Sequence, residues 1–133
     1  MVIESVIVNG VKIYPFKERK QLIEFVNIHK GILVAVNAEK ILHATDETRR
    51  IINANIGYPD GIGAVMAIKK NGIKEVVRIP GVELWISLIE EFDNSKSFYL
   101  LGSTQEVISK TVSKLRELFP SINIVGFRDG FFD

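Results

Sequence analysis

The sequence predicts an α/β fold built on a mainly parallel sheet with helices on both faces, preceded by a small N-terminal β-hairpin. Two observations carry this prediction. Short apolar runs alternate with amphipathic segments from residue 32 to residue 125, which is the pattern of strand–helix–strand units. Ahead of them, Asn9-Gly10 separates two runs rich in β-branched residues, which indicates a tight hairpin turn.

The predicted elements follow one another at ordinary spacings. The expected strands are residues 2–8, 11–14, 32–36, 56–58, 75–79, 98–101 and 122–125. The expected helices are residues 17–28, 38–53, 62–70, 84–92 and 107–119. The runs 32–36 and 98–101 are continuously apolar, which is typical of strands buried on both faces. We therefore expect core positions at Val34, Leu100 and Val112, and core packing for Trp85.

Composition narrows the function classes. No linker, repeat or low-complexity segment interrupts the 133 residues, so we expect a single α/β domain over 1–133. A hydrophobic content of 47% with 25% charged residues is that of a globular protein, and a net charge of +1 offers no basic footprint for nucleic acid. The absence of cysteine excludes disulfides and a thiolate nucleophile.

Polar residues and glycines follow four of the predicted strands. In open α/β sheets, ligands bind beyond the carboxyl ends of the strands, and free N–H groups of helix N-termini bind phosphate. The residues at these positions are Asn37-Ala38-Glu39, Asp60-Gly61, Gly102-Ser103-Thr104 and Gly126-Phe127-Arg128-Asp129. We expect these strands to be parallel neighbours, so that the four segments lie at one edge of a Rossmann-like sheet. Together they favour a small-molecule site over purely structural roles.

The stretch Asn55–Gly63 is the most informative part of that edge. Pro59 fixes its own φ and pushes the preceding residue toward extended geometry, while Gly61 and Gly63 leave the backbone beside Asp60 uncovered. Two interpretations of Asp60 are open. It is either the N-cap of the following helix, since Asp is among the best caps, or a carboxylate exposed to a ligand.

The ordered set of motifs resembles the WecG/TagA/CpsF glycosyltransferase family over essentially the whole chain. Those enzymes transfer an N-acetylmannosamine-type sugar from a UDP donor to a lipid-linked acceptor in bacterial surface-polysaccharide and cell-wall synthesis. The motifs are Val36-Asn37-Ala38-Glu39, Pro59-Asp60-Gly61, Arg78-Ile79-Pro80-Gly81-Val82-Glu83-Leu84, Leu100-Leu101-Gly102, and Ile124-Val125-Gly126 with Asp129-Gly130-Phe131-Phe132.

The resemblance implies roles for individual residues. Asp60 takes the place of the family's proposed catalytic base, Asn37 that of the Asn in its Thr-x-Asn motif, and Arg78 that of the Arg in its Arg-x-x-Gly-x-Asp motif. The expected roles are Asp60 as base, Asn37 orienting sugar or acceptor, and Arg78 near the diphosphate. Further substrate-binding positions are expected at Gly61, Gly102 and Ser103.

The chain also departs from the family pattern. Ala35 stands where the family has Thr, and Glu83 stands where it has Asp. The family continues past the last motif into another helix, a strand and a Pro-Lys-Gln-Glu motif, so this chain resembles the N-terminal two-thirds of the catalytic core. The alternative function is therefore a non-catalytic nucleotide-binding or assembly module of the same fold. A receiver-like signalling domain is disfavoured, because Asp60 stands without an acidic cluster.

Elementary chemistry is consistent with a transferase. A single carboxylate can take the proton from an attacking hydroxyl, and an arginine or helix N-termini can stabilise departing UDP. Neither an Asp-x-Asp motif nor a histidine cluster is present, so we predict no metal and no cofactor, and an inverting displacement. The longest apolar run is far short of the roughly 20 residues that span a bilayer. We expect a cytoplasmic chain, with peripheral association at the inner membrane face and homo-oligomerisation both left open.

Overall fold

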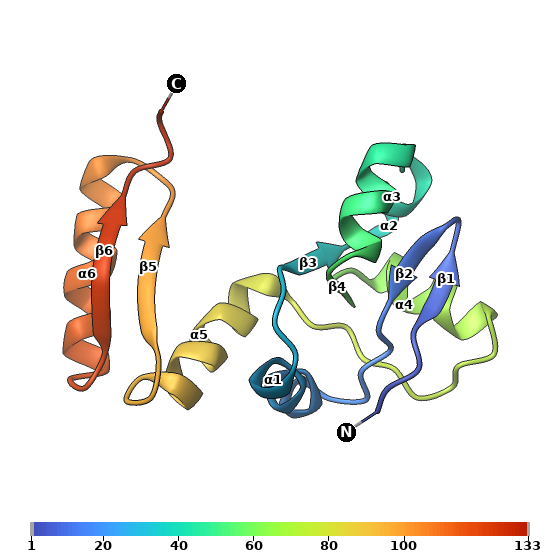
Figure 1. Ribbon diagram of the computed structural model, residues 1–133, viewed down its shortest axis with the longest axis horizontal. Helices are drawn as coiled ribbons and strands as arrows, with labels where there is room; N and C mark the ends of the chain where they lie inside the picture. Colours follow the sequence, from blue (N-terminus) through green and yellow to red (C-terminus); the bar gives the residue numbers. More distant parts are fainter. Residues whose placement is uncertain (1, 133) are drawn as a thin grey trace. The chain divides into compact units, whose positions relative to one another are not determined.

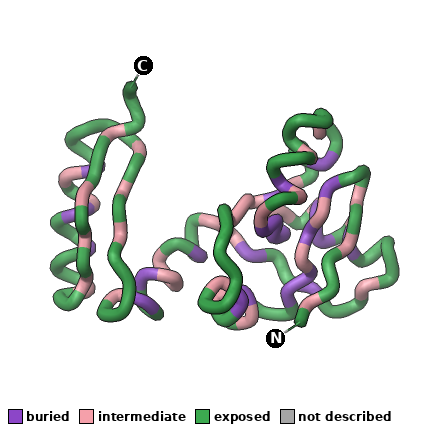
Figure 2. Tube along the Cα trace, in the orientation of Figure 1, coloured by how far each residue is buried: buried purple, intermediate pink, exposed green. Residues whose placement is uncertain are grey.

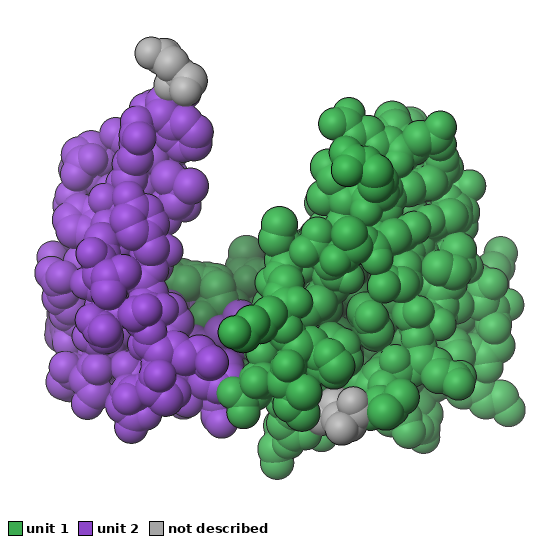
Figure 3. All heavy atoms as spheres, viewed as in Figure 1, with its two compact units in different colours: residues 1–85 green, residues 86–133 purple. Residues whose placement is uncertain are grey.

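The computed structural model describes residues 2–132 and divides the chain into two compact units, Met1–Trp85 and Ile86–Asp133 (Figure 3). Each unit is described by itself. Unit 1 contains β1 (Val6–Val8), β2 (Val11–Ile13), α1 (Arg19–Ile28), β3 (Leu33–Val36), α2 (Ala38–Leu42), α3 (Asp46–Asn53), β4 (Ile56–Pro59), α4 (Ile62–Lys70) and the first residues of α5 (Gly81–Phe92). Unit 2 contains the rest of α5, β5 (Ser97–Leu101), α6 (Gln105–Leu118) and β6 (Asn123–Arg128).

Unit 1 is organised by an antiparallel hairpin and a parallel strand pair. β1 and β2 pair around Asn9 and Gly10, whose φ angles of 49° and 79° are those of the predicted tight turn. β3 and β4 pair in parallel, with Val36 opposite Pro59 (Figure 1). The Tyr14 N–H donates to the Gly57 carbonyl at 2.8 Å, which ties the end of the hairpin to β4.

The core of unit 1 lies between the hairpin, the strand pair and helices α2 to α4. Figure 2 shows buried positions concentrated in this region, where the cluster comprises Val11, Ile13, Val36, Ile41, Ile52, Ala64, Val65, Ile68 and Val76. Phe16 and Phe25, two buried aromatic residues of which the second belongs to α1, pack edge to face. The predicted helices and strands of this region therefore enclose a real hydrophobic core.

Unit 2 is a parallel strand pair with a helix on one face. β5 and β6 pair in parallel, and α6, which connects them, contributes the buried residues Ile108, Val112 and Leu115. Along both strands, exposed side chains alternate with half-buried ones, as expected when only one face is covered. The exposed side chains of the other face are Tyr99, Leu101, Val125 and Phe127.

The α/β character, the hairpin and the parallel pairing are confirmed. The described residues form three two-stranded sheets, so the single continuous Rossmann-like sheet stays a prediction, as does the single domain. Residues 75–79 were predicted as a strand and form no ladder. They make isolated backbone bonds instead, from Val77 N–H to the Phe16 carbonyl and from Ile79 N–H to the Pro59 carbonyl.

The helix predicted over 38–53 is broken into α2 and α3. The break occurs at Thr45, whose hydroxyl accepts from the Thr48 N–H at 3.1 Å while the Thr48 hydroxyl accepts from the Thr45 N–H at 2.8 Å. This capping box satisfies the first N–H groups of a new helix and fixes its start. The strand predicted over 2–8 begins only at Val6.

The predicted burial of the two apolar runs holds only at Val36, which is fully buried. Ile32, just before β3, is 61% exposed, and Tyr99 and Leu101 are 59% and 58% exposed, because α6 covers only one face of the β5–β6 pair within unit 2. Val34 and Leu100 are half-buried, so only Val112, at 2% exposure, is a core residue as expected. Trp85 is 40% exposed and is not core packing either. None of the helices within residues 2–132 is long and apolar enough to cross a membrane.

Candidate active site

Asn37 and Asp60 lie side by side where the parallel pair of unit 1 ends. Each directly follows the last residue of its strand, and the Asp60 N–H donates to the Val36 carbonyl at 3.0 Å, which extends the pairing by one step. A Cβ on Gly61 would stand 3.5 Å from the Asn37 Cβ. The parallel register thus brings the amide and the carboxylate to one edge, as the strand-end argument predicts.

Close packing of two helix starts holds this edge together. A Cβ added to Gly63, near the start of α4, would lie 2.8 Å from the Cβ of Ala38, the first residue of α2. Real Cβ atoms do not approach so closely, so only glycine permits this arrangement. The position of Asn37 beside Asp60 therefore depends on residue 63 having no side chain.

Asp60 is not the N-cap of the helix that follows it. Gly61 is the N-cap residue of α4, and no side chain bonds the first N–H groups of that helix. The Asp60 Oδ1 instead accepts from the N–H of Gly81, the first residue of α5, at 3.3 Å. A helix N-terminus carries partial positive charge, which stabilises the carboxylate there. Within residues 2–132, no basic side chain forms an ion pair with Asp60.

Arg78 is oriented by the backbone of the same residue. Its Nε–H donates to the carbonyl oxygen of Asp60 at 2.9 Å, and the side chain is otherwise exposed. One edge of the guanidinium is therefore used to hold the side chain in place. The other edge keeps N–H donors that could bind an anionic group, since the guanidinium fork suits phosphate oxygens.

Tyr58 is a member of this group that the sequence analysis did not single out. It is only 5% exposed, and its hydroxyl lies 3.1 Å from the point that a Cβ on Gly81 would occupy. The Asp60 Oδ2 lies 3.7 Å from the same point. Burial, and secondarily the charge of Asp60, raise the pKa of the Tyr58 phenol above its usual value. Strand alternation was the available signal, because residues 58 and 60 share a face.

Asn37 has a structural role as well. Its side-chain oxygen accepts from the Lys40 N–H at 2.9 Å and so caps α2. The amide nitrogen of Asn37 has no hydrogen-bond partner within the described part of the chain. Because the cap fixes the rotamer, this nitrogen is held in a defined direction.

Gly102 and Ser103 belong to unit 2, where they follow β5. Both have positive φ, at 146° and 58°, and the Ser103 carbonyl accepts from the Gly130 N–H at 2.8 Å. This turn joins the ends of β5 and β6 within unit 2. The structure therefore brings together Asn37, Asp60, Gly61 and Arg78, whereas Gly102 and Ser103 are placed only relative to their own unit.

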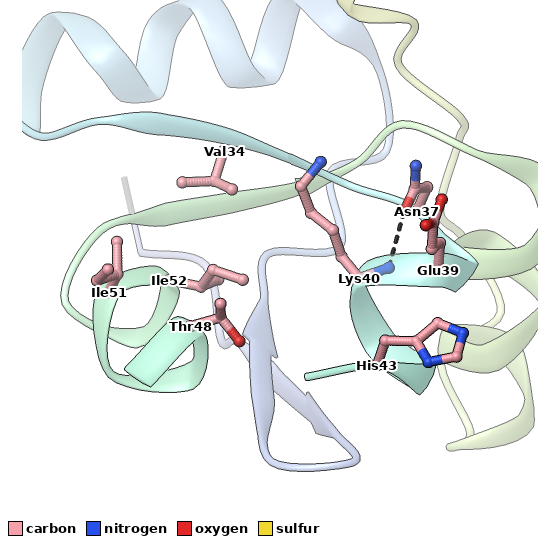
Figure 4. Close-up of a pocket in the computed structure, with 8 residues that line it drawn as sticks. All are labelled: Val34, Asn37, Glu39, Lys40, His43, Thr48, Ile51 and Ile52. Carbon is pink, nitrogen blue, oxygen red and sulfur yellow. Dashed lines mark hydrogen bonds between the residues drawn. The ribbon is translucent and has the colours of Figure 1, made fainter. Parts of the chain in front are cut away.

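A cavity of about 480 Å³ lies against α2 and α3 (Figure 4). It is lined by Val34, Asn37, Glu39, Lys40, His43, Thr48, Ile51 and Ile52. Val34 precedes Ala35, so the cavity is on the face of β3 opposite to Ala35 and Tyr58. Apart from Asn37, it shares no residue with the group around Asp60. Among residues 2–132, no cluster of three or more His, Asp or Glu side chains is placed to hold a metal ion.

A comparison with protein families gives a match over most of the chain. The model of the glycosyl transferase WecG/TagA/CpsF family matches residues 6–133, which includes both units and every residue of the group around Asp60. The match extends over nearly the whole sequence, as the ordered motifs suggest. The chain belongs to the WecG/TagA/CpsF family of glycosyltransferases.

Proposed function

We propose that this chain transfers an N-acetylmannosamine-type sugar from a UDP donor to a lipid-linked acceptor in surface-polysaccharide synthesis, with inversion and without a metal ion. The observation that carries the proposal is the Asp60 carboxylate, which has no cationic partner within residues 2–132 and stands between two helix starts. A carboxylate in such a place can accept a proton. The identity of the sugar, donor and acceptor comes from the resemblance.

The proposed reaction is a single displacement. An acceptor hydroxyl oxygen forms a bond to the anomeric carbon while the bond from that carbon to the diphosphate oxygen breaks. The diphosphate leaves with the electron pair as UDP, and Asp60 takes the proton of the hydroxyl. General-base catalysis of this kind contributes about 10²–10⁴-fold to a rate.

The neighbouring groups support complementary roles. The unused edge of the Arg78 guanidinium, held by the Asp60 carbonyl, would stabilise the charge that develops on the diphosphate. The free amide nitrogen of Asn37 would orient the sugar or the acceptor. The bare backbone at Gly61 would let the substrate approach the start of α4. Gly102 and Ser103 of unit 2 are proposed as further substrate contacts. Because the family's acceptor is lipid-linked, the reaction is proposed to occur at the inner face of the membrane.

The test is a transfer assay with UDP-N-acetylmannosamine and a lipid-like acceptor, comparing the wild type with Asp60→Asn. Asn can still accept from the Gly81 N–H, so the variant should keep its unfolding midpoint. Its rate should fall by about 10²–10⁴-fold, because an amide cannot act as the base. The matched control is Asp93→Asn, which removes a carboxylate outside the group around Asp60.

Two results would contradict the proposal. Transfer by Asp60→Asn at nearly the wild-type rate would remove Asp60 as the base. Binding of UDP or of the UDP-sugar without any transfer by the wild type would favour the non-catalytic nucleotide-binding module.

A further inference from the structure

Tyr58 has a buried ring, but its hydroxyl oxygen reaches solvent and makes no bond within the described chain. The residue is 95% buried by area, since only 5% is exposed, and no group within residues 2–132 forms a hydrogen bond with its hydroxyl. The hydroxyl oxygen is not one of the fully buried atoms that lack a partner, so water or a ligand can reach it. The hydroxyl is therefore available to bond to a ligand that approaches Asp60.

The space beside this hydroxyl is open and is shared with Asp60. The point that a Cβ on Gly81 would occupy lies 3.1 Å from the Tyr58 hydroxyl and 3.7 Å from Asp60 Oδ2. Among residues 2–132, these are the heavy atoms within 4 Å of that point, once Gly81, its chain neighbours and the backbone of its own helix are left aside. An atom of a ligand beside Gly81 would thus face a hydroxyl and a carboxylate together, at the start of α5.

The residue paired with Tyr58 on the neighbouring strand supplies no polar group. Ala35, directly opposite Tyr58 in the ladder, has no polar side-chain atom, so Tyr58 supplies the polar group of this pair. Burial and the charge of Asp60 raise the pKa of the phenol, which therefore keeps its proton at neutral pH and can donate. Asp60 can only accept. The two groups would hold a ligand that offers an oxygen to one and a hydroxyl proton to the other.

We infer that the Tyr58 hydroxyl contacts the sugar that is transferred, donating a hydrogen bond to one of its oxygens beside Asp60. This inference rests on the proposed function, in which Asp60 acts at the anomeric carbon. The Tyr58 hydroxyl lies beside the carboxylate of Asp60, which takes the proton at the sugar, whereas Arg78 bonds only the main-chain carbonyl of Asp60. Tyr58 is then a specificity-determining residue for the sugar, while Arg78 serves the diphosphate.

The experiment compares the wild type with Tyr58→Phe, which removes one oxygen and keeps the ring. Thermal unfolding is measured without ligand, with UDP, and with UDP-N-acetylmannosamine, and transfer kinetics are measured alongside. Tyr14→Phe is the control, because Tyr14 is a half-buried tyrosine whose ring packs on Phe16 and Phe25. A ligand that binds only the folded state must raise the unfolding temperature.

We expect Tyr58→Phe to be at least as stable as the wild type without ligand, since its hydroxyl makes no bond to lose. The shift with UDP should be unchanged, and the additional shift given by the sugar should be lost. KM for the UDP-sugar should rise about tenfold, as for one lost hydrogen bond to a substrate. Tyr14→Phe should match the wild type in all of these measurements.

Each other outcome overturns the inference. An equal sugar-dependent shift in Tyr58→Phe and the wild type would overturn it alone and leave the proposed function standing. A clear loss of stability without ligand would show that the hydroxyl has a structural partner. No shift of the wild type with either UDP ligand would overturn the proposed function, and this inference with it.

Discussion

The Nε–H of Arg78 donates to the main-chain carbonyl of Asp60 at 2.9 Å and leaves the carboxylate of that residue without a cationic partner in the described chain. The arginine is held in the site, yet it does not neutralise the group beside it. The proposed base and the proposed phosphate-binding group can therefore lie next to each other without neutralising each other's charge.

This arrangement predicts the effect of Arg78→Lys. A lysine keeps the charge but cannot both donate to the Asp60 carbonyl and present a second edge to the diphosphate. Loss of one charge-assisted hydrogen bond, about 1.5–3 kcal/mol, should weaken UDP binding roughly tenfold to hundredfold. Isothermal titration calorimetry with UDP measures this, with Arg50→Lys as the control. Equal affinities would show that Arg78 is only a solvated surface residue.

Gly63→Ala should destabilise the protein although alanine is the better helix former. The helix propensity of Ala favours the variant by roughly 0.5–1 kcal/mol. The Cβ clash with Ala38 at 2.8 Å costs more, about 1–3 kcal/mol for an overpacked contact, and it displaces Asn37. Chemical denaturation measures the net loss. The double variant Ala38→Gly with Gly63→Ala removes the facing methyl group and should recover stability; a failure to recover would place the strain elsewhere.

Thr45→Ala should weaken the start of α3 and lower the free energy of unfolding. The variant removes one side of the capping box, at a typical cost of about 1 kcal/mol. Thr45→Ser keeps the hydroxyl and should retain most of the stability. Urea unfolding curves of the three proteins provide the measurement, and identical midpoints for Ala and Ser would argue against the cap.

Stability should fall at high pH in a way that depends on Tyr58. The pKa of its phenol is raised in the folded state, so the folded protein holds this proton more tightly than the unfolded chain does. The contribution is fully present below the unfolded pKa of about 10 and is lost as the pH rises through the higher folded value. Unfolding free energies of the wild type and Tyr58→Phe should diverge in that window, the wild type losing more. Parallel curves would mean that the phenol ionises freely.

The sequence was sufficient to predict that Asn37 and Asp60 lie together at one edge of the sheet. Strand–helix alternation implies parallel pairing, and parallel pairing brings the strand ends together. It was insufficient for the partner of the Asp60 carboxylate. Aspartate before a helix suggests a local cap, and only the tertiary fold brings the N–H of Gly81, 21 residues further on, within reach. Long-range contacts of this kind leave no local pattern.

Other differences have simple physical origins. The break at Thr45 was encoded by Thr45-Asp46-Glu47-Thr48, a capping sequence that the continuing helical pattern obscured. The exposure of Tyr99 and Leu101 could not be predicted from the local sequence. A short apolar run has the same sequence pattern whether one face of the strand or both faces are covered. Tyr58 was overlooked because an aromatic residue in an apolar strand ordinarily signals packing alone.

A point mutation at Gly81 would block the candidate site without unfolding the protein. Its φ is not in the left-handed region, so alanine there would fold into the first turn of α5 without backbone strain. The new methyl group would fill the point between the Tyr58 hydroxyl and the Asp60 carboxylate, and glycine and alanine codons differ by one base. Under the proposed function, a single nucleotide change would thus give a protein that folds and keeps its motifs almost intact but excludes the sugar.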